Sequence, residues 1–263
     1  MEFIGYFFAV IIGIILGLIG GGGSILTVPV FVYLFNFDAI TATALSLFVV
    51  GVSSSIGSIN YSIKRLIDFK TAFIFGVPSV IGVLFSRSLV IPNLPNMIIN
   101  DFGITISKHA FLLIIFAILM LISAYKMIKK TDRKYVQSAL DSNDTLLVSQ
   151  GLMVGILTGL IGFGGGFLIV PALVILQNKK MKEAIATSLF IISLNSLIGF
   201  LIALNITKID WDFLLGFTSL SILGIFIGIL ISKRINGNQL KPIFGWFILI
   251  IGLITVAKEL FIK

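Results

Sequence analysis

Long apolar runs separated by short polar breaks organise this chain. In the first half they cover about residues 3–35, 39–63, 70–91 and 109–129, and in the second about 146–176, 183–204, 212–232 and 240–261. Most of them reach the roughly 18 to 20 apolar residues that a helix needs to cross a bilayer. The pattern predicts an all-α, polytopic membrane protein with membrane units at 1–130 and 146–263, joined by a polar linker at 131–145.

The two halves repeat each other at a constant offset of 142 residues. The stretch GIILGLIGGGGSILTVPVFVYL (13–34) falls on GILTGLIGFGGGFLIVPALVIL (155–176), and 24 of 57 positions are identical between 13–69 and 155–211. Two apolar segments can match by chance because they use few residue types. Here glycines, prolines, serines and an aspartate also match, without a gap, and chance does not explain that. We therefore predict two homologous repeats of about four hydrophobic segments each. The first repeat carries an extra loop of about ten residues around 93–103.

The first segment of each repeat contains a glycine cluster, which predicts a broken helix at membrane depth, because each glycine costs a helix about 1 kcal/mol. Such a break is tolerated only inside protein or against water, and the half-helix that follows it offers free N–H groups to an anion. Two equivalent breaks indicate a substrate site near the midplane. The candidate substrate-binding residues here are Gly20, Gly22, Gly23, Ser24, Gly162, Gly164, Gly165 and Gly166, and the candidate gating or helix-breaking residues are Pro29 and Pro171.

Other glycines in these segments fit helix packing better than ligand binding. Gly13 with Gly17, and Gly155 with Gly159, have the small-xxx-small spacing of close helix pairs. The clusters at 20–23 and 162–166 hold more glycine than packing requires. We therefore assign packing to the first four glycines and a ligand-facing backbone to the clusters.

The next segments carry polar residues at matched positions. Ser46 corresponds to Ser188, and Ser53 corresponds to Asn195. Inside a bundle these side chains could donate hydrogen bonds to an oxyanion, and the alternative is hydrogen bonding between helices, worth about 1 kcal/mol each. We include all four among the candidate substrate-binding residues.

The charged residues near the segments are few. Asp68 and Asp210 are matched and precede an aromatic residue at the start of a segment, which favours helix caps over a proton relay. Arg87 could attract anions, although snorkelling to the interface explains its position near a segment end better.

Composition narrows the classes of function. The chain is 58% apolar and 11% charged, with a mean hydropathy of +1.15. It has no cysteine and one histidine, so we expect no disulfide, no metal site, no cofactor and no catalytic triad. The basic residues form no nucleic-acid module. The N-terminus lacks a basic leader and a cleavage site, and we expect it to be the first membrane segment.

Charge counting discriminates between two topologies. If each broken segment turns back and leaves by the side it entered, 14 lysines and arginines lie on one side and 5 on the other; straight crossing gives 11 and 8. Basic residues in short loops collect on the cytoplasmic side. The count favours inverted-topology repeats with both termini outside and the linker in the cytoplasm.

The doubled motifs GLIGGGGSILTVP and GLIGFGGGFLIVP, each followed by an A-x-A-x-SLF stretch, resemble the TauE/SafE family of sulfite and organosulfonate exporters. The resemblance covers nearly the whole chain, with one minor departure between GGGGS and GFGGG. It implies a multi-pass transporter of the cell (plasma) membrane that moves small sulfur-containing anions.

The reasoning from the residues also favours an anion transporter, since it predicts helix breaks that can bind an anion and finds no obvious intramembrane carboxylate. Facilitated diffusion of a small anionic substrate across the lipid bilayer, driven by its gradient and the membrane potential, is therefore our hypothesis. An anion-selective channel, a small carboxylate permease, a membrane enzyme and an assembly protein are the alternatives. Substrate, direction, coupling ion and any homo-oligomer are left open by the sequence.

Overall fold

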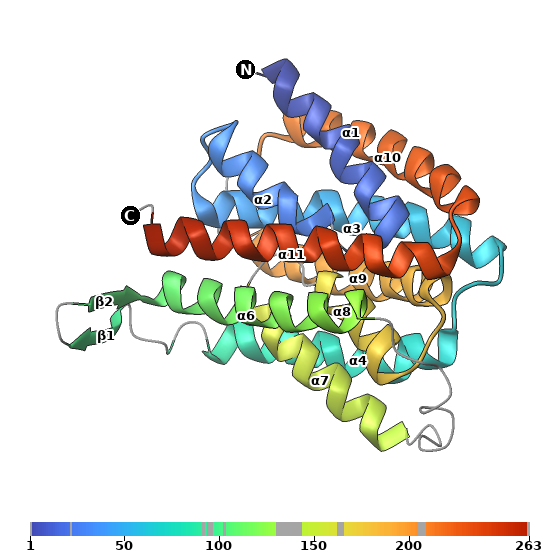
Figure 1. Ribbon diagram of the computed structural model, residues 1–263. Coiled ribbons are helices and arrows are strands. Elements are labelled where there is room, and N and C mark those ends of the chain that lie inside the picture. Colours follow the sequence, from blue (N-terminus) through green and yellow to red (C-terminus); the bar gives the residue numbers. More distant parts are fainter. Residues whose placement is uncertain are drawn as a thin grey trace.

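In the computed structural model the described residues form a bundle of helices and a small hairpin (Figure 1). The structure describes residues 2–21, 23–90, 93, 97–101, 104–129, 144–161, 166–204 and 209–261. The first half contains α1 (Glu2–Ile19), α2 (Gly23–Tyr33), α3 (Ala39–Ile63), α4 (Phe69–Phe85), the π-helix η1 (Ser86–Val90) and α6 (Lys108–Ile128). The second contains α7 (Asp144–Ile161), α8 (Gly166–Pro171), the π-helix η3 (Ala172–Leu176), α9 (Met181–Ala203), α10 (Trp211–Arg234) and α11 (Gly237–Phe261).

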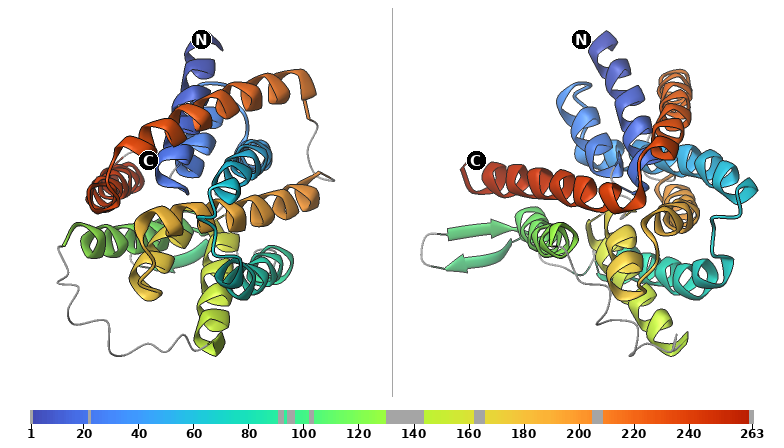
Figure 2. Two further views of the ribbon diagram at one scale, coloured as in Figure 1. Left: turned by 90° about the vertical axis from the view of Figure 1, so that its right-hand side faces the viewer. Right: turned by 45° about the vertical axis from the view of Figure 1, so that its right-hand side comes forward.

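The hydrophobic pattern gave these helices to within a few residues, and it missed a hairpin in the extra loop of the first half. There β1 (Met97–Asp101) and β2 (Ile104–Ser107) pair antiparallel, with Asp101 opposite Ile104. The expectation of a plain loop was wrong because each flank holds an isoleucine-rich segment, MIIND and ITIS, and β-branched residues favour strands. The hairpin lies at the same end of the molecule as the end of α11 (Figures 1 and 2).

The outer surfaces of the helices are apolar, as the membrane prediction requires. Within the described residues, five helices are long and apolar enough to cross a bilayer. The α4 helix exposes Phe69, Phe73, Val77, Ile81 and Phe85, one residue in every four, which is a continuous stripe along one helical face. A stripe of this kind is stable against lipid and not against water. The chain is therefore an all-α, multi-pass membrane protein.

Each broken segment folds back on itself. In the first half Gly5 lies against the Phe35 ring, and Gly23 lies against the Ile12 carbonyl and the Leu16 side chain. The end of α2 therefore lies beside the start of α1, and the two helices run in opposite directions. In the second half Gln177 Nε2 donates to Gln150 Oε1 at 2.6 Å, which brings the two ends of the broken segment together. Both segments leave at the end of the molecule where they enter.

Equivalent helices of the two halves pair in opposite directions. On α3 and α9, Leu47 lies beside Gly199 and Gly57 lies beside Leu189. The α6 and α11 helices also run antiparallel, since Gly245 meets Met127 and Gly252 meets Met120, and both pairs are visible in Figures 1 and 2. Repeats of opposite topology require this arrangement, because parallel repeats would make equivalent helices run in the same direction.

Close helix packing uses the glycines to which the sequence assigned that role. Gly13 and Gly17 of α1 lie against the backbone of α10 around Gly224 and Gly228, and a Cβ at any of them would clash. Gly155 and Gly159 of α7 make the matching contacts with α4. The packing interpretation of Gly13, Gly17, Gly155 and Gly159 is therefore confirmed.

Candidate functional site

The two glycine clusters meet in the interior of the bundle. Gly20 has a φ of 91°, a backbone conformation that residues other than glycine rarely adopt. A Cβ at Gly21 would clash with the Gly166 carbonyl, and a Cβ at Gly166 would come within 2.9 Å of the Gly21 Cα. Glycine is required here because two backbones, one from each half, touch directly. The helix starts that follow the two breaks, at Gly23 and Gly166, are thereby brought close to each other.

Some of the other predicted site residues lie outside the residues that the structure describes. Gly22, Gly162, Gly164 and Gly165 lie outside the described residues, as does the side chain of Ser24. Pro29 lies inside α2 without ending it. Pro171 is buried at the point where α8 passes into the π-helix η3, which is consistent with a proline that removes a backbone donor.

The matched polar residues of α3 and α9 reach serines of the opposite half. Ser53 Oγ donates to Ser221 Oγ at 3.1 Å, and Asn195 Nδ2 donates to Ser79 Oγ at 2.8 Å. Ser79 and Ser221 are themselves 142 residues apart, so the same hydrogen bond forms twice at equivalent positions. The alternative of hydrogen bonding between helices is thus confirmed for Ser53 and for Asn195. Ser79 and Ser221 were missed from the sequence, although the repeat offset marks them.

The other matched pair lies next to a break. Ser188 Oγ donates to the Ile185 carbonyl at 2.9 Å and would lie 2.8 Å from a Cβ at Gly20. Its hydroxyl therefore borders the left-handed turn of the first cluster. Ser46, its counterpart, is buried on α3 with 2% of its surface exposed.

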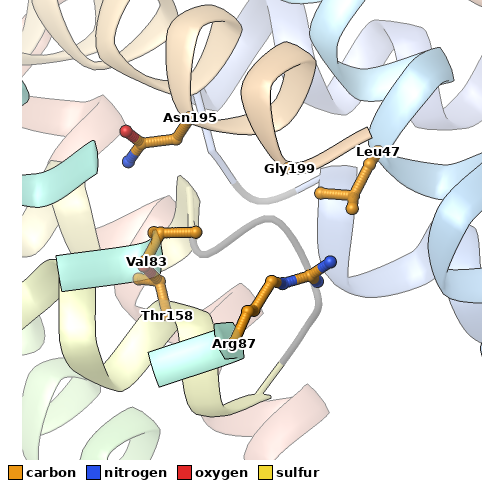
Figure 3. A pocket seen from close by; sticks show the side chains of 6 residues that line it. All are labelled: Leu47, Val83, Arg87, Thr158, Asn195 and Gly199. Atoms are coloured by element: carbon orange, nitrogen blue, oxygen red, sulfur yellow. The ribbon is translucent and has the colours of Figure 1, made fainter. Parts of the chain in front are cut away.

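A small pocket opens beside these residues, lined by Leu47, Val83, Arg87, Thr158, Asn195 and Gly199 (Figure 3). Its side chains come from α3, α4, η1, α7 and α9, so both halves contribute. The space holds about one water molecule. Ile192, one turn before Asn195 on α9, contacts the Gly166 backbone, which links the pocket to the meeting point of the two breaks.

Among the described residues that line this pocket, Arg87 is the charged one. The sequence favours snorkelling to the interface for this residue, and in the structure the side chain lines the pocket and extends toward Leu47 in Figure 3. Sequence spacing places Arg87 only near the end of a segment. The π-helix η1 (Ser86–Val90) changes the side-chain register there, which spacing alone could not show. At the position equivalent to Arg87 the second half has Ile229.

The matched aspartates are helix caps, as predicted. The Asp210 carboxylate accepts from the backbone of Asp212 and Phe213 at the start of α10. Asp68 accepts from the Thr71 backbone at 3.0 Å at the start of α4 and forms an ion pair with Lys179. Partial burial alone would raise the pKa of Asp68, but the hydrogen bonds from Lys179 and Thr71 lower it to about 2. The Asp68 carboxylate is therefore ionised at neutral pH.

Comparison with known proteins gives a consistent result. Residues 6–255 match the family model described as "Sulfite exporter TauE/SafE". A "Probable membrane transporter protein" of Methanocaldococcus jannaschii is 26% identical over 93% of this chain and 92% of its own length. YunE of Bacillus subtilis, also named a probable membrane transporter protein, is 27% identical over 96% of this chain and 97% of its own length. A protein of the same description from Xylella fastidiosa is 26% identical over 95% of this chain and 92% of its own length. The search of solved structures returned no match.

Proposed function

The chain belongs to the TauE/SafE family of membrane transporters, and on that premise we propose that it carries small sulfur-containing anions, such as sulfite or organosulfonates, across the plasma membrane. The substrate binds near the middle of the bundle, where the glycine clusters of the two halves meet. The substrate path is lined by backbone atoms of Gly20, Gly23 and Gly166. Ser46, Ser53, Ser188 and Asn195 bring polar side chains to the same region.

The observation that carries the proposal is the position of Arg87. An ionisable residue inside a membrane protein is unfavourable against lipid and marks a substrate path when it faces the interior. Arg87 is the charged residue among the described residues that line the pocket, and the others are neutral. A guanidinium presents several N–H donors in a plane, which suits the oxygens of an oxyanion. The pocket therefore favours a small anion over a cation or a neutral solute.

The driving force follows from the charge of the substrate. None of the described residues that line the pocket is acidic, and we propose facilitated diffusion without a carboxylate proton relay. A membrane potential that is negative inside expels an anion by about 2.3 kcal/mol per charge for each 100 mV or so. Export of an anion needs no other energy source under these conditions.

We propose the inverted topology that the charge count favours. The loop residues Lys64 and Arg65, with Lys179, Lys233 and Arg234, then face the cytoplasm. Both termini and the β-hairpin face outward. The fold-back of both broken segments and the antiparallel pairing of equivalent helices support this assignment.

Flux measurements on purified protein in liposomes test the proposal. Sulfite efflux is followed with an imposed potential, an imposed proton gradient, or neither. We expect efflux to saturate, to follow the potential and to ignore the proton gradient. Flux that does not saturate and shows no counterflow would indicate a channel. Uptake of small carboxylates in place of sulfite would indicate a carboxylate permease.

The contribution of Arg87 is tested with a matched pair of variants. Arg87→Gln is expected to lower the rate at least tenfold, because a buried charge-assisted hydrogen bond is worth about 1.5 to 3 kcal/mol. Arg87→Lys keeps the charge without the planar donor geometry and should retain part of the activity. Arg65→Gln removes an arginine from an exposed loop and is the control. Equal flux in Arg87→Gln and Arg65→Gln would contradict the proposal.

A further inference from the structure

Serines inside a helix usually donate to a backbone carbonyl one turn earlier, and several serines of α3 and α9 do so. Ser55 donates to the Gly51 carbonyl at 2.8 Å and Ser58 to the Ser55 carbonyl at 2.8 Å. On α9, Ser193 donates to the Phe190 carbonyl at 2.7 Å. These hydroxyls are satisfied by their own helix and need no other partner.

Two serines of the same helices behave differently. Ser54 and Ser196 are each 0% exposed, and among the described residues their hydroxyls have no hydrogen-bond partner. A buried hydroxyl without a partner is destabilising, and alanine would avoid that penalty. The two serines are 142 residues apart, so the same unsatisfied hydroxyl occurs at equivalent positions in the two halves.

Each of the two serines directly follows a residue that hydrogen-bonds to the opposite half. Ser54 follows Ser53, which hydrogen-bonds to α10, and Ser196 follows Asn195, which hydrogen-bonds to α4. The Asn195 Oδ1 atom is also buried without a partner among the described residues. Asn195 lines the pocket together with Arg87. Unsatisfied polar atoms therefore occur on both α3 and α9, and one of them, on Asn195, borders the pocket that Arg87 also lines.

We propose that Ser54 and Ser196 are substrate-binding residues that donate hydrogen bonds to the oxygens of the transported oxyanion, one from each repeat. This rests on the proposed transport function. Arg87 supplies charge on one side only, whereas the two hydroxyls are placed symmetrically. Each half of the path thus has a neutral donor that holds the oxyanion without binding it too tightly to leave.

The experiment uses Ser54→Ala, Ser196→Ala and the double variant of the full-length protein. Thermal unfolding in detergent is measured without anion and with increasing sodium sulfite or sodium methanesulfonate, at constant ionic strength set with sodium gluconate. Sulfite efflux from liposomes is measured on the same preparations. Ser193→Ala is the control, because it removes a buried serine hydroxyl of α9 that its own helix already satisfies. Ser53→Ala serves as the stability reference.

Without anion, Ser54→Ala and Ser196→Ala are expected to melt at or above the temperature of the unchanged protein. Ser53→Ala is expected to melt lower, because it leaves Ser221 without its partner. The sulfite concentration that gives half of the stabilisation should rise about tenfold for each serine lost, which corresponds to about 1.4 kcal/mol. Ser193→Ala should leave that concentration unchanged.

Two outcomes would overturn the inference while transport stands. In the first, Ser54→Ala and Ser196→Ala respond to sulfite as the unchanged protein does, while Arg87→Gln does not respond. In the second, both alanine variants melt as low as Ser53→Ala, which would show that their hydroxyls have structural partners. If the unchanged protein itself shows no saturable response to either anion, the proposed function fails, and this inference fails with it.

Discussion

The ion pair between Asp68 and Lys179 gives a prediction whose size follows from the structure. It joins the start of α4, in the first half, to the loop before α9, in the second half. The Asp68 backbone N–H also donates to Thr187 Oγ1 of α9 at 3.1 Å. Asp68 therefore connects the two halves at the end of the molecule that we assign to the cytoplasm, and loss of its charge should weaken that connection.

The magnitude follows from the pKa of Asp68, which falls from an ordinary 3.8 to about 2. A drop of about 1.8 in pKa corresponds to roughly 2.4 kcal/mol, at about 1.36 kcal/mol per pKa unit. Because the Lys179 and Asp68 side chains remain 26% and 31% exposed, solvent screening reduces this to about 1 to 2 kcal/mol. Thr71 shares in lowering the pKa, so the pair itself should contribute about 1 kcal/mol.

A double-mutant cycle measures this value. Asp68→Asn keeps a good capping side chain and removes the charge, Lys179→Met removes the ammonium group, and the double variant closes the cycle. Unfolding free energies are measured in detergent. The control cycle uses Lys180 and Glu183, whose charged atoms are 3.9 Å apart and whose side chains are 78% and 38% exposed. Its coupling should be at most about 0.5 kcal/mol. Equal coupling in the two cycles would refute the reasoning.

Three further predictions concern pH, packing and topology. Since the folded-state pKa of Asp68 is lowered, its stabilisation is complete above about pH 4 and is lost as pH falls toward about 2. Acid titration of stability should therefore be steeper in the unchanged protein than in Asp68→Asn, and parallel curves would contradict this. Gly155→Ala places a Cβ against the Ser79 backbone and should destabilise by about 1 to 3 kcal/mol. Gly216→Ala, where nothing lies within 4 Å, should stabilise by up to about 1 kcal/mol, and equal melting temperatures would contradict the packing account. Because the chain has no cysteine, Asp212→Cys and Asn236→Cys can be labelled individually in intact cells. A membrane-impermeant maleimide should reach Asp212→Cys directly and Asn236→Cys only after permeabilisation; the reverse pattern would contradict the inverted topology.

The two halves close their equivalent turns with different chemistry. Asn36 and Asn178 both have a positive φ, of 56° and 52°. The next residue then donates its N–H six positions back in each case, Phe37 to the Phe31 carbonyl and Lys179 to the Leu173 carbonyl, both at 3.1 Å. Phe37 packs on the Phe213 ring with centroids 5.4 Å apart, whereas Lys179 pairs with Asp68. One end is therefore held by apolar contacts and the other by charge.

Most of the fold could be predicted from the sequence. The apolar runs gave the helix boundaries, because backbone polar groups in lipid must be satisfied within the segment. The glycine clusters marked the helix interruptions, because glycine is unfavourable in a helix interior. The aspartate caps at Asp68 and Asp210 followed from their place before an apolar run. The isoleucine-rich strands of the hairpin were missed because a short two-stranded element gives a weak signal beside such long apolar runs.

Much of the candidate site could not be predicted in this way. The repeat offset identified Ser53 and Asn195, but it did not show that Ser221 and Ser79 are their partners, and it left Arg87 near an interface. Contacts of this kind join residues more than 100 positions apart and depend on how helices cross. Local pattern determines which segments are helical and which faces are apolar. Only the tertiary structure decides which polar side chains meet in the interior, because that depends on the packing of every helix around them.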